Sequence, residues 1–422
     1  MPRLLAAAGL LALASLPVTA EARLSPMEKE PDWSRLDVFQ KTMTRSEFKL
    51  LVDEVYAPDG VFWRYAKLGQ NSVTVYSTSA KKRKLWTLEF APDDRQRQKP
   101  PLQFAPDRKI GAEGKPLAGM TICLDPGHIG GDWAKIEERF FQIGDDRPII
   151  EAELNLITCR YLKQKLEALG AKVVMTKDDY EPVTSQRPDD LMDEAQEAYR
   201  IWNRRSSGSI SARRAARIAR GLFYRNAEIK ARAALIDKWK PDLTICVHYN
   251  ASAWGDPGRP RLTGKSRLVN FVHGAYSARE LEYDDQKFYM LRNVLDRIYP
   301  HEVAAADAIA KQTAAKFRLG PEVYKNWNAV QQVGPNPYVY ARNLVANRVF
   351  RGPVIFVEGP YMNAKDAYYW MEAGDYEGTK TFNGRKVPNI MKVYADAVAK
   401  GIVEYAQGDL FRATKARIES KS

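Results

Sequence analysis

Apolar runs typical of buried strands alternate with helix-patterned segments along most of this 422-residue chain. Because such an alternation buries a sheet between layers of helices, it predicts an α/β domain with a mostly parallel twisted sheet flanked by helices on both faces. We expect this domain to span residues 119–410. Its strands are predicted at residues 120–124, 172–176, 243–247, 268–272 and 354–357, and its helices at residues 153–169, 228–240 and 390–405.

A small α+β module is expected in front of this domain, at residues 32–92. Thr44 and Glu47 have the spacing of a capping box, so a helix should begin there, and two short strands should follow the break at residues 58–60. Aromatic residues at strand spacing usually belong to a core. The alternative is a glycan-stacking surface made by the four aromatic residues Trp63, Tyr65, Tyr76 and Trp86.

The chain has the features of an exported protein. Residues 1–20 combine Arg3, an apolar run and a small-residue site, which is the pattern of a cleavable secretory signal. No other segment has the pattern of a membrane span, and residues 93–115, rich in Pro, Arg, Gln and Lys, are expected to form a linker. Because the protein is expected to be exported, the formal charge of +13 indicates an anionic envelope polymer rather than nucleic acid as partner. With no wall-anchoring repeat visible, a periplasmic location is favoured.

Two of the four histidines come just past apolar strand runs: His128 after the run at residues 120–124 and His248 after the run at residues 243–247. Side chains just beyond the carboxyl ends of parallel strands converge above one edge of the sheet. Glu151 would add a carboxylate to the two imidazoles, which completes the donor set of a catalytic zinc site with its fourth position open to water. For either histidine taken alone, an ordinary loop residue is the favoured interpretation.

The sequence around these residues resembles the zinc-dependent N-acetylmuramoyl-L-alanine amidases of bacterial cell walls, of the amidase 3 type. The resemblance runs from about residue 119 to residue 407 and is carried by four motifs in the family's order: residues 124–128, Glu151 with Asn155, residues 247–251, and residues 354–358 with Asn363. It implies that His128, Glu151 and His248 bind zinc and that Glu358 serves the chemistry. One departure is that Ile129 stands where the family usually has a glycine, which leaves the conformation of that loop open.

The resemblance implies hydrolysis of the amide between N-acetylmuramic acid and L-alanine in peptidoglycan. A water activated by zinc would be the nucleophile and Glu358 the general base, unless Glu358 is merely paired with an arginine such as Arg232. Arg232, Asn250 and Asn363 are expected to support the site or contact substrate. The alternatives are another zinc peptidase or deacetylase of the envelope and a noncatalytic or regulated peptidoglycan-binding protein.

Two insertions interrupt the α/β pattern. Residues 188–226 are helix-prone and strongly basic. Two interpretations are open: a charged face exposed to solvent, or an arm that contacts the anionic wall or a partner. Residues 275–300 fall where some family members carry a helix that covers the zinc until an activator protein releases it. An activator acting on a helical insertion is therefore a candidate partner.

The remaining cysteines and histidines are expected to be mainly structural. Cys123 and Cys246 lie within strands, so buried thiols are favoured over a disulfide between them. His273 follows a strand and could line the cleft, whereas His301 is expected to be structural.

Overall fold

The computed structural model describes residues 23–101, 114–204, 208–253, 255–256, 259–325, 328–382 and 384–408. The predicted secretory signal and most of the predicted linker lie outside these ranges. Among the described residues, no helix is both long enough and apolar enough to span a membrane.

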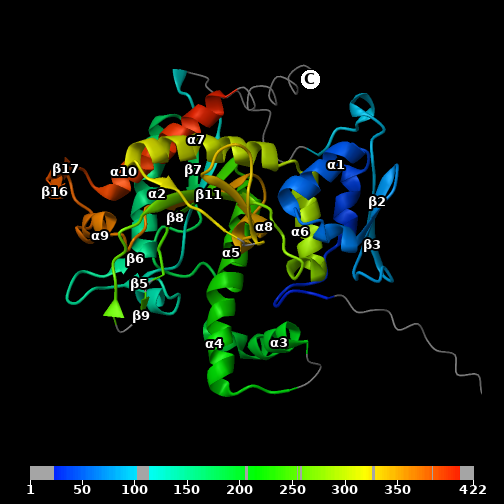
Figure 1. Ribbon diagram of the computed structural model, residues 1–422, viewed down its shortest axis with the longest axis horizontal. Coiled ribbons are helices and arrows are strands. Elements are labelled where there is room, and N and C mark those ends of the chain that lie inside the picture. Colours follow the sequence, from blue (N-terminus) through cyan, green and yellow to red (C-terminus); the bar gives the residue numbers. More distant parts are fainter. Residues whose placement is uncertain are drawn as a thin grey trace, which may run out of the picture.

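In the described part of the chain, the larger domain is built on an eight-stranded sheet with the order β13-β14-β11-β15-β8-β4-β7 and with β12 beside β11 (Figure 1). β7, β4, β8 and β15 run parallel, whereas β11 is antiparallel to β15. The strands are β4 (Thr121–Pro126), β7 (Lys172–Met175), β8 (Leu243–Tyr249), β11 (Arg267–His273), β12 (Gly320–Pro321), β13 (Val330–Gln332), β14 (Val339–Arg342) and β15 (Val354–Gly359). The carboxyl ends of β4, β8 and β15 therefore meet at one edge of the sheet, and that of β11 lies at the opposite edge.

Helices cover both faces of this sheet, which confirms the predicted fold class. α2 (Glu151–Ala168), α7 (Tyr299–Phe317) and α10 (Ile390–Gln407) pack on one face, and α5 (Glu228–Trp239) and α8 (Val345–Val349) on the other. Successive strand residues alternate between the two cores, so that Leu124 belongs to the first and Cys123 to the second. Cys123, Cys159 and Cys246 are buried free thiols, and the alternative of a disulfide is therefore wrong. α9 (Lys365–Glu372) and three short hairpins, β5–β6 (Phe140–Phe141, Ile149–Ile150), β9–β10 (Gly255–Asp256, Arg259–Pro260) and β16–β17 (Lys380–Phe382, Arg385–Val387), complete the domain.

The N-terminal module has the predicted helix and strands. α1 (Arg45–Leu51) continues into a π-helical turn at Val52–Tyr56, and a three-stranded sheet follows with β1 (Ala66–Leu68), β2 (Ser72–Tyr76) and β3 (Lys84–Glu89). Only half of the expected capping box forms. Thr44 Oγ1 accepts the backbone N–H of Glu47 at 3.4 Å, but the Glu47 carboxylate pairs with Arg97 and Arg297.

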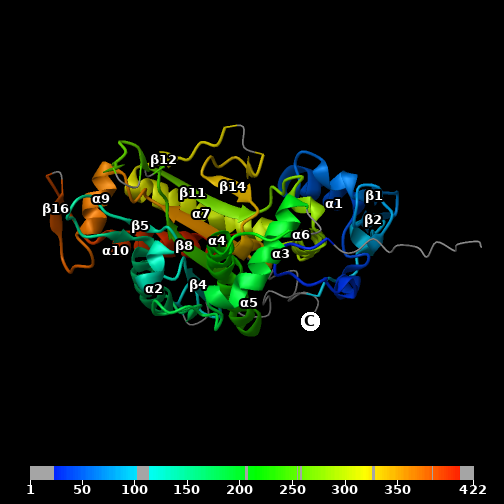
Figure 2. The same ribbon diagram turned by 90° about the horizontal axis from the view of Figure 1, so that it is seen from below.

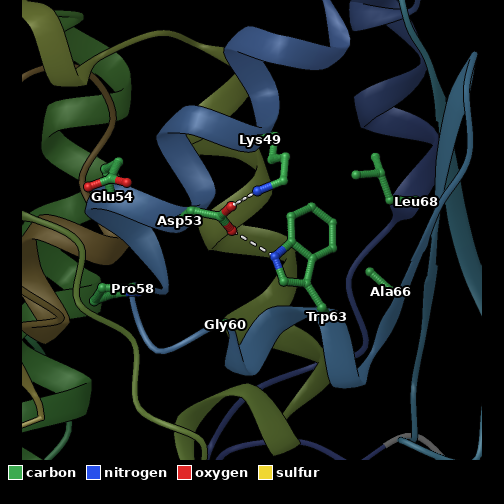
Figure 3. Close-up of a pocket in the computed structure, with 8 residues that line it drawn as sticks. All are labelled: Lys49, Asp53, Glu54, Pro58, Gly60, Trp63, Ala66 and Leu68. Carbon is green, nitrogen blue, oxygen red and sulfur yellow. Dashed lines mark hydrogen bonds and ion pairs between the residues drawn. The ribbon is translucent and has the colours of Figure 1, made fainter.

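The aromatic residues of the module serve mainly as core. Tyr65 and Trp86 are buried, so the four aromatics do not share one exposed surface. Trp63 is half-buried and lines a shallow cavity of about 510 Å³, where its indole N–H donates to Asp53 at 2.7 Å (Figure 3). Lys49 contacts the same carboxylate, so Lys49, Asp53 and Trp63 already satisfy one another in this cavity.

The insertion at residues 275–300 does not cover the edge that carries His128 and His248, and that expectation is wrong. Its helix α6 (Asp284–Leu295) follows the end of β11 and so lies at the opposite edge of the sheet, packed against the module (Figure 1). The Lys287 ammonium donates to Asp284 at 2.9 Å and to the Ser77 carbonyl at 3.0 Å, and Ser77 Oγ donates to Asp284 at 2.8 Å. This helix thus joins the two parts of the protein.

The other insertion, residues 188–226, forms a projecting helical arm (Figure 1). It consists of α3 (Met192–Asn203) and α4 (Ala212–Leu222), and a π-helical turn at Phe223–Ala227 joins α4 to α5. Because α5 leads into the start of β8, the arm extends from the sheet edge at which β8 ends. The arm's arginines Arg213, Arg214, Arg217 and Arg220 are exposed.

Candidate metal centre

Three predicted ligands meet at the carboxyl edge of β4 and β8. His128 Nε2 lies 3.1 Å from Glu151 Oε2, and His248 Nδ1 lies 3.0 Å from Glu151 Oε1. One ligand atom from each of the three residues falls within 4.8 Å of the other two. Glu151 is buried between the two partly exposed imidazoles, so the group has the composition and spacing of a metal site.

The backbone before His128 is shaped for this approach. Pro126 pairs with Val247 in the parallel ladder, which brings the ends of β4 and β8 side by side. A Cβ atom on Gly127 would lie 2.3 Å from Cε1 of the His248 ring, so only glycine fits there. His128 itself has a φ of 65°, a left-handed conformation that turns its side chain over the edge.

Arg232 holds the turn that precedes His128. Its guanidinium donates to the carbonyls of Pro126 at 2.8 Å and His128 at 2.9 Å, and it pairs with Asp125 and Glu228. Arg232 is only 1% exposed, so it supports the loop and does not reach a substrate. Its carboxylate partners are Asp125 and Glu228, so Arg232 is not the arginine that pairs with Glu358.

Glu137 is a supporting residue that sequence reasoning missed. Its buried carboxylate accepts the backbone N–H groups of Ile129 at 3.0 Å and Gly130 at 3.1 Å, and it lies 3.5 Å from His128 Nδ1. A carboxylate on one ring nitrogen orients the other toward a metal. Although burial opposes the charged form, Glu151 and Glu137 raise the pKa of His128 to about 9. No periodic pattern marks Glu137 in its loop, so only the fold could reveal it.

Arg139 was also missed. Its Nε lies 3.2 Å from Glu151 Oε2. Burial opposes ionisation of Glu151, yet His128 and His248 hold the pKa of that carboxyl well below its usual range. The carboxylate is therefore ionised and ready to act as a ligand.

Glu358 lies in β15 directly beside His248, its partner in the parallel register. Burial raises the pKa of the Glu358 carboxyl; His248 opposes this effect and Glu151 reinforces it. A carboxylate of raised proton affinity beside the three ligands is suited to accept and return a proton.

The two predicted asparagines order the loops around the site. The Asn363 amide is buried and exchanges two hydrogen bonds of 3.0 Å with the backbone of Ser252. Asn250 Oδ1 accepts the N–H of Ala251 at 2.8 Å, and its carbonyl accepts that of Met362 at 2.8 Å. Both therefore join the segment after β8 to the segment after β15.

The other two histidines lie away from the centre. His273 is fully buried where β11 ends, bonded to Tyr276 and Asn293 at the opposite edge, so it does not line the cleft. His301 contacts the Tyr405 hydroxyl at 3.1 Å, consistent with the structural role expected for it.

Residues 122–382 match the family model described as N-acetylmuramoyl-L-alanine amidase, which covers more than half of the 422 residues. The chain belongs to this family. Its enzyme class is accordingly that of the N-acetylmuramoyl-L-alanine amidases, and the metal-type group and Glu358 lie within the matched range. No curated protein sequence matches the chain.

Several solved amidases are similar at low identity. The amidase Ami1 from Mycobacterium smegmatis is 16% identical with a TM-score of 0.39, over 68% of this chain and 97% of that one. CwlD from Clostridioides difficile, in complex with the GerS lipoprotein, is 14% identical with a TM-score of 0.37, over 68% and 98%. AmiC2 of Nostoc punctiforme is 13% identical with a TM-score of 0.35, over 68% and 98%.

Proposed function

We propose that this amidase is zinc-dependent and that it hydrolyses the amide joining N-acetylmuramic acid to the L-alanine of peptidoglycan. The observation that carries the proposal is the convergence of His128, Glu151 and His248 from three separate elements beside Glu358. Two imidazoles and one carboxylate suit zinc, whereas calcium and magnesium prefer oxygen ligands throughout. The residues present thus fit the metal.

The ligands would be His128 through Nε2, His248 through Nδ1 and the Glu151 carboxylate. Zinc in such a site lowers the pKa of a water and polarises a carbonyl. Glu137 keeps Nδ1 of His128 engaged, and Arg232 fixes the backbone on either side of Gly127. These contacts hold the imidazole in place before any substrate arrives.

Glu358 would act as the general base and then as the general acid. It takes a proton from the attacking water as the new C–O bond forms, and it gives that proton to the amide nitrogen as the C–N bond breaks. The products are a carboxylic acid on the muramic acid side and a free amine on L-alanine. The reaction consumes one water molecule, and Glu358 returns the proton that it takes, so there is no net change in protons or electrons.

The cellular setting is part of the same proposal. Residues 1–20 would direct export, the periplasm is the favoured location, and peptidoglycan is the partner. The domain limits proposed from the sequence are 32–92 for the accessory module, 93–115 for the linker and 119–410 for the catalytic domain. Among the described residues of the two insertions, those of the arm at residues 188–226 pack against the loop that carries His128, through Ile129, so an activator would act on the arm.

Mass spectrometry of purified peptidoglycan tests the proposal. Digestion with the zinc-loaded protein should release peptides that begin at L-alanine and leave peptide-free glycan, and Glu358→Gln should release neither while still binding zinc. Deacetylated sugars or peptides cut internally would instead indicate another envelope hydrolase. Intact muropeptides from the parent protein, with tight binding to the wall, would favour the noncatalytic alternative.

A further inference from the structure

A basic pocket lies at the carboxyl end of β15, the edge of the sheet at which the proposed metal ligands also lie. It has a volume of about 810 Å³ and is lined by the start of β11, the end of α7, the start of α9 and the β16–β17 hairpin. Pro360, two residues after Glu358, forms part of its wall, and the N–H of Tyr361 donates to Ser266 Oγ at 3.0 Å. α9 and β16 lie together at the end of the molecule away from the module (Figures 1 and 2). The pocket thus shares the sheet edge of the proposed catalytic site.

The pocket lining carries a surplus of positive charge. Asp366 is the carboxylate among the lining residues, against the cations Lys265, Arg267, Arg318, Lys365 and Arg385. Within the described residues, none of these cations forms an ion pair with a carboxylate. Arg267 is held in place, because its guanidinium donates to the Pro321 carbonyl at 2.7 Å. Several unpaired cations around one cavity favour a ligand that carries more than one negative charge.

One wall of the pocket is aromatic and rigid. The rings of Phe317 and Trp370 meet edge to face at a centroid distance of 6.3 Å. The Trp370 indole N–H donates to the Pro388 carbonyl at 2.9 Å, so its polar group is already satisfied. The wall therefore offers apolar surface to the aliphatic part of a ligand whose charges face the cations.

We infer that this pocket is a subsite for the free carboxylates of the peptide whose amide is cut, an inference that rests on the proposed function. The scissile amide is at the N-terminus of that peptide, so its later residues must leave the centre along the protein surface. Each extended residue covers roughly 3.4 Å, and a pocket of this size holds several of them. The carboxylates of those residues would meet Arg318, Lys365 and Arg385 in the pocket.

The test compares two substrates and two double variants. The substrates are N-acetylmuramoyl-L-Ala-D-Glu-L-Lys-D-Ala and the same molecule with its peptide carboxylates amidated. Arg318→Gln with Lys365→Gln should raise KM for the acidic substrate about five- to tenfold with kcat unchanged, and should leave the amidated substrate unaffected. The control, Lys67→Gln with Lys84→Gln, removes two exposed cations from the module and should change neither.

The outcomes separate this inference from the proposed function. If the parent cleaves the acidic and amidated substrates with equal KM, the subsite is overturned and the amidase stands. If it cleaves neither but binds the free tetrapeptide in calorimetry, and the Arg318 and Lys365 changes weaken that binding, the subsite stands and the amidase is overturned. Binding of glycerol phosphate oligomers without binding of the tetrapeptide would overturn the assignment of a peptide ligand.

Discussion

Replacing Arg232 should weaken zinc binding although the residue is not itself a proposed ligand. Its guanidinium contacts four acceptors at once: the carboxylates of Asp125 and Glu228 and the carbonyls of Pro126 and His128. Lysine keeps the charge but offers a single point donor, so Arg232→Lys cannot reach all four. The carbonyl of His128 would then lose its hydrogen bond, and the backbone around Gly127 would no longer be held from both sides.

The magnitude follows from burial. The side chains of Asp125 and Glu228 are 3% and 1% exposed, and breaking such a buried pair from one side costs about 3–5 kcal/mol of stability. We expect that loss for Arg232→Met and a smaller one for Arg232→Lys. Loss of a contact that orients a ligand lowers metal affinity about 10- to 100-fold, which is the effect expected on the zinc Kd of both variants.

Competition with a chelator measures zinc affinity, and urea unfolding of the metal-free proteins measures stability. Arg292→Met is the matched control, because Arg292 is also a buried arginine; it lies on α6, away from the metal centre, and donates to the carbonyls of Arg348 and Phe350. It should lose stability with an unchanged zinc Kd. If Arg232→Lys bound zinc as tightly as the parent, or if the control lost affinity equally, the role assigned to Arg232 would be wrong.

Three further predictions concern other residues of the fold. Gly127→Ala should abolish zinc binding in calorimetry because its Cβ would clash with His248, whereas Gly221→Ala, where nothing lies within 4 Å, should bind as the parent does. Glu358→Gln should lower kcat at least about 100-fold with zinc still bound, and an unchanged kcat would exclude the residue from the chemistry. Burial raises the pKa of Glu302 from 4.5 to about 8, so its stabilising effect is complete below pH 4.5 and is lost as pH rises through 8. Urea unfolding should therefore show a fall in stability over this range that is smaller in Glu302→Gln, and parallel profiles for the two proteins would contradict this.

Five strands of the large sheet and the proposed ligands could be predicted because both depend on local pattern, whereas the strands β12, β13 and β14 and the helix α7 were not predicted. The apolar runs that end at His128 and His248 are the strands β4 and β8, and the predicted helices and strands agree with the observed bounds within two residues. The positions of ligand residues at strand ends can be predicted along with the strands, because the parallel register determines which strand ends lie side by side. The roles of Glu137 and Arg139 depend on how one loop folds back toward His128 and Glu151. The sequence has no periodic pattern from which that loop conformation could be predicted.

The wrong expectations for His273 and the insertion after it share one cause, the direction of β11. Only a β11 parallel to β15 would have brought His273 to the edge of His248. Parallel neighbours need a crossover connection, usually a helix, and residues 250–266 contain no helix among those that the structure describes. β11 instead pairs antiparallel with β15, so the chain after it emerges at the opposite edge. The missing crossover was visible in the sequence and could have corrected both expectations.

The isoleucine at position 129 and the helical arm at residues 188–226 belong together, because the arm packs against the side chain of Ile129. Ile129 is the position at which the chain departs from the glycine usual in the resembling amidases, and its side chain is fully buried in an apolar cluster with Leu191, Leu222 and Phe223 of the arm. A glycine there would offer the arm no side chain to pack against. Because Ile129 directly follows His128 and its N–H is held by Glu137, the arm is packed onto the loop that carries a proposed ligand. A partner that displaces the arm would therefore act on the position of His128, a coupling that neither the insertion nor the substitution reveals when each is considered alone.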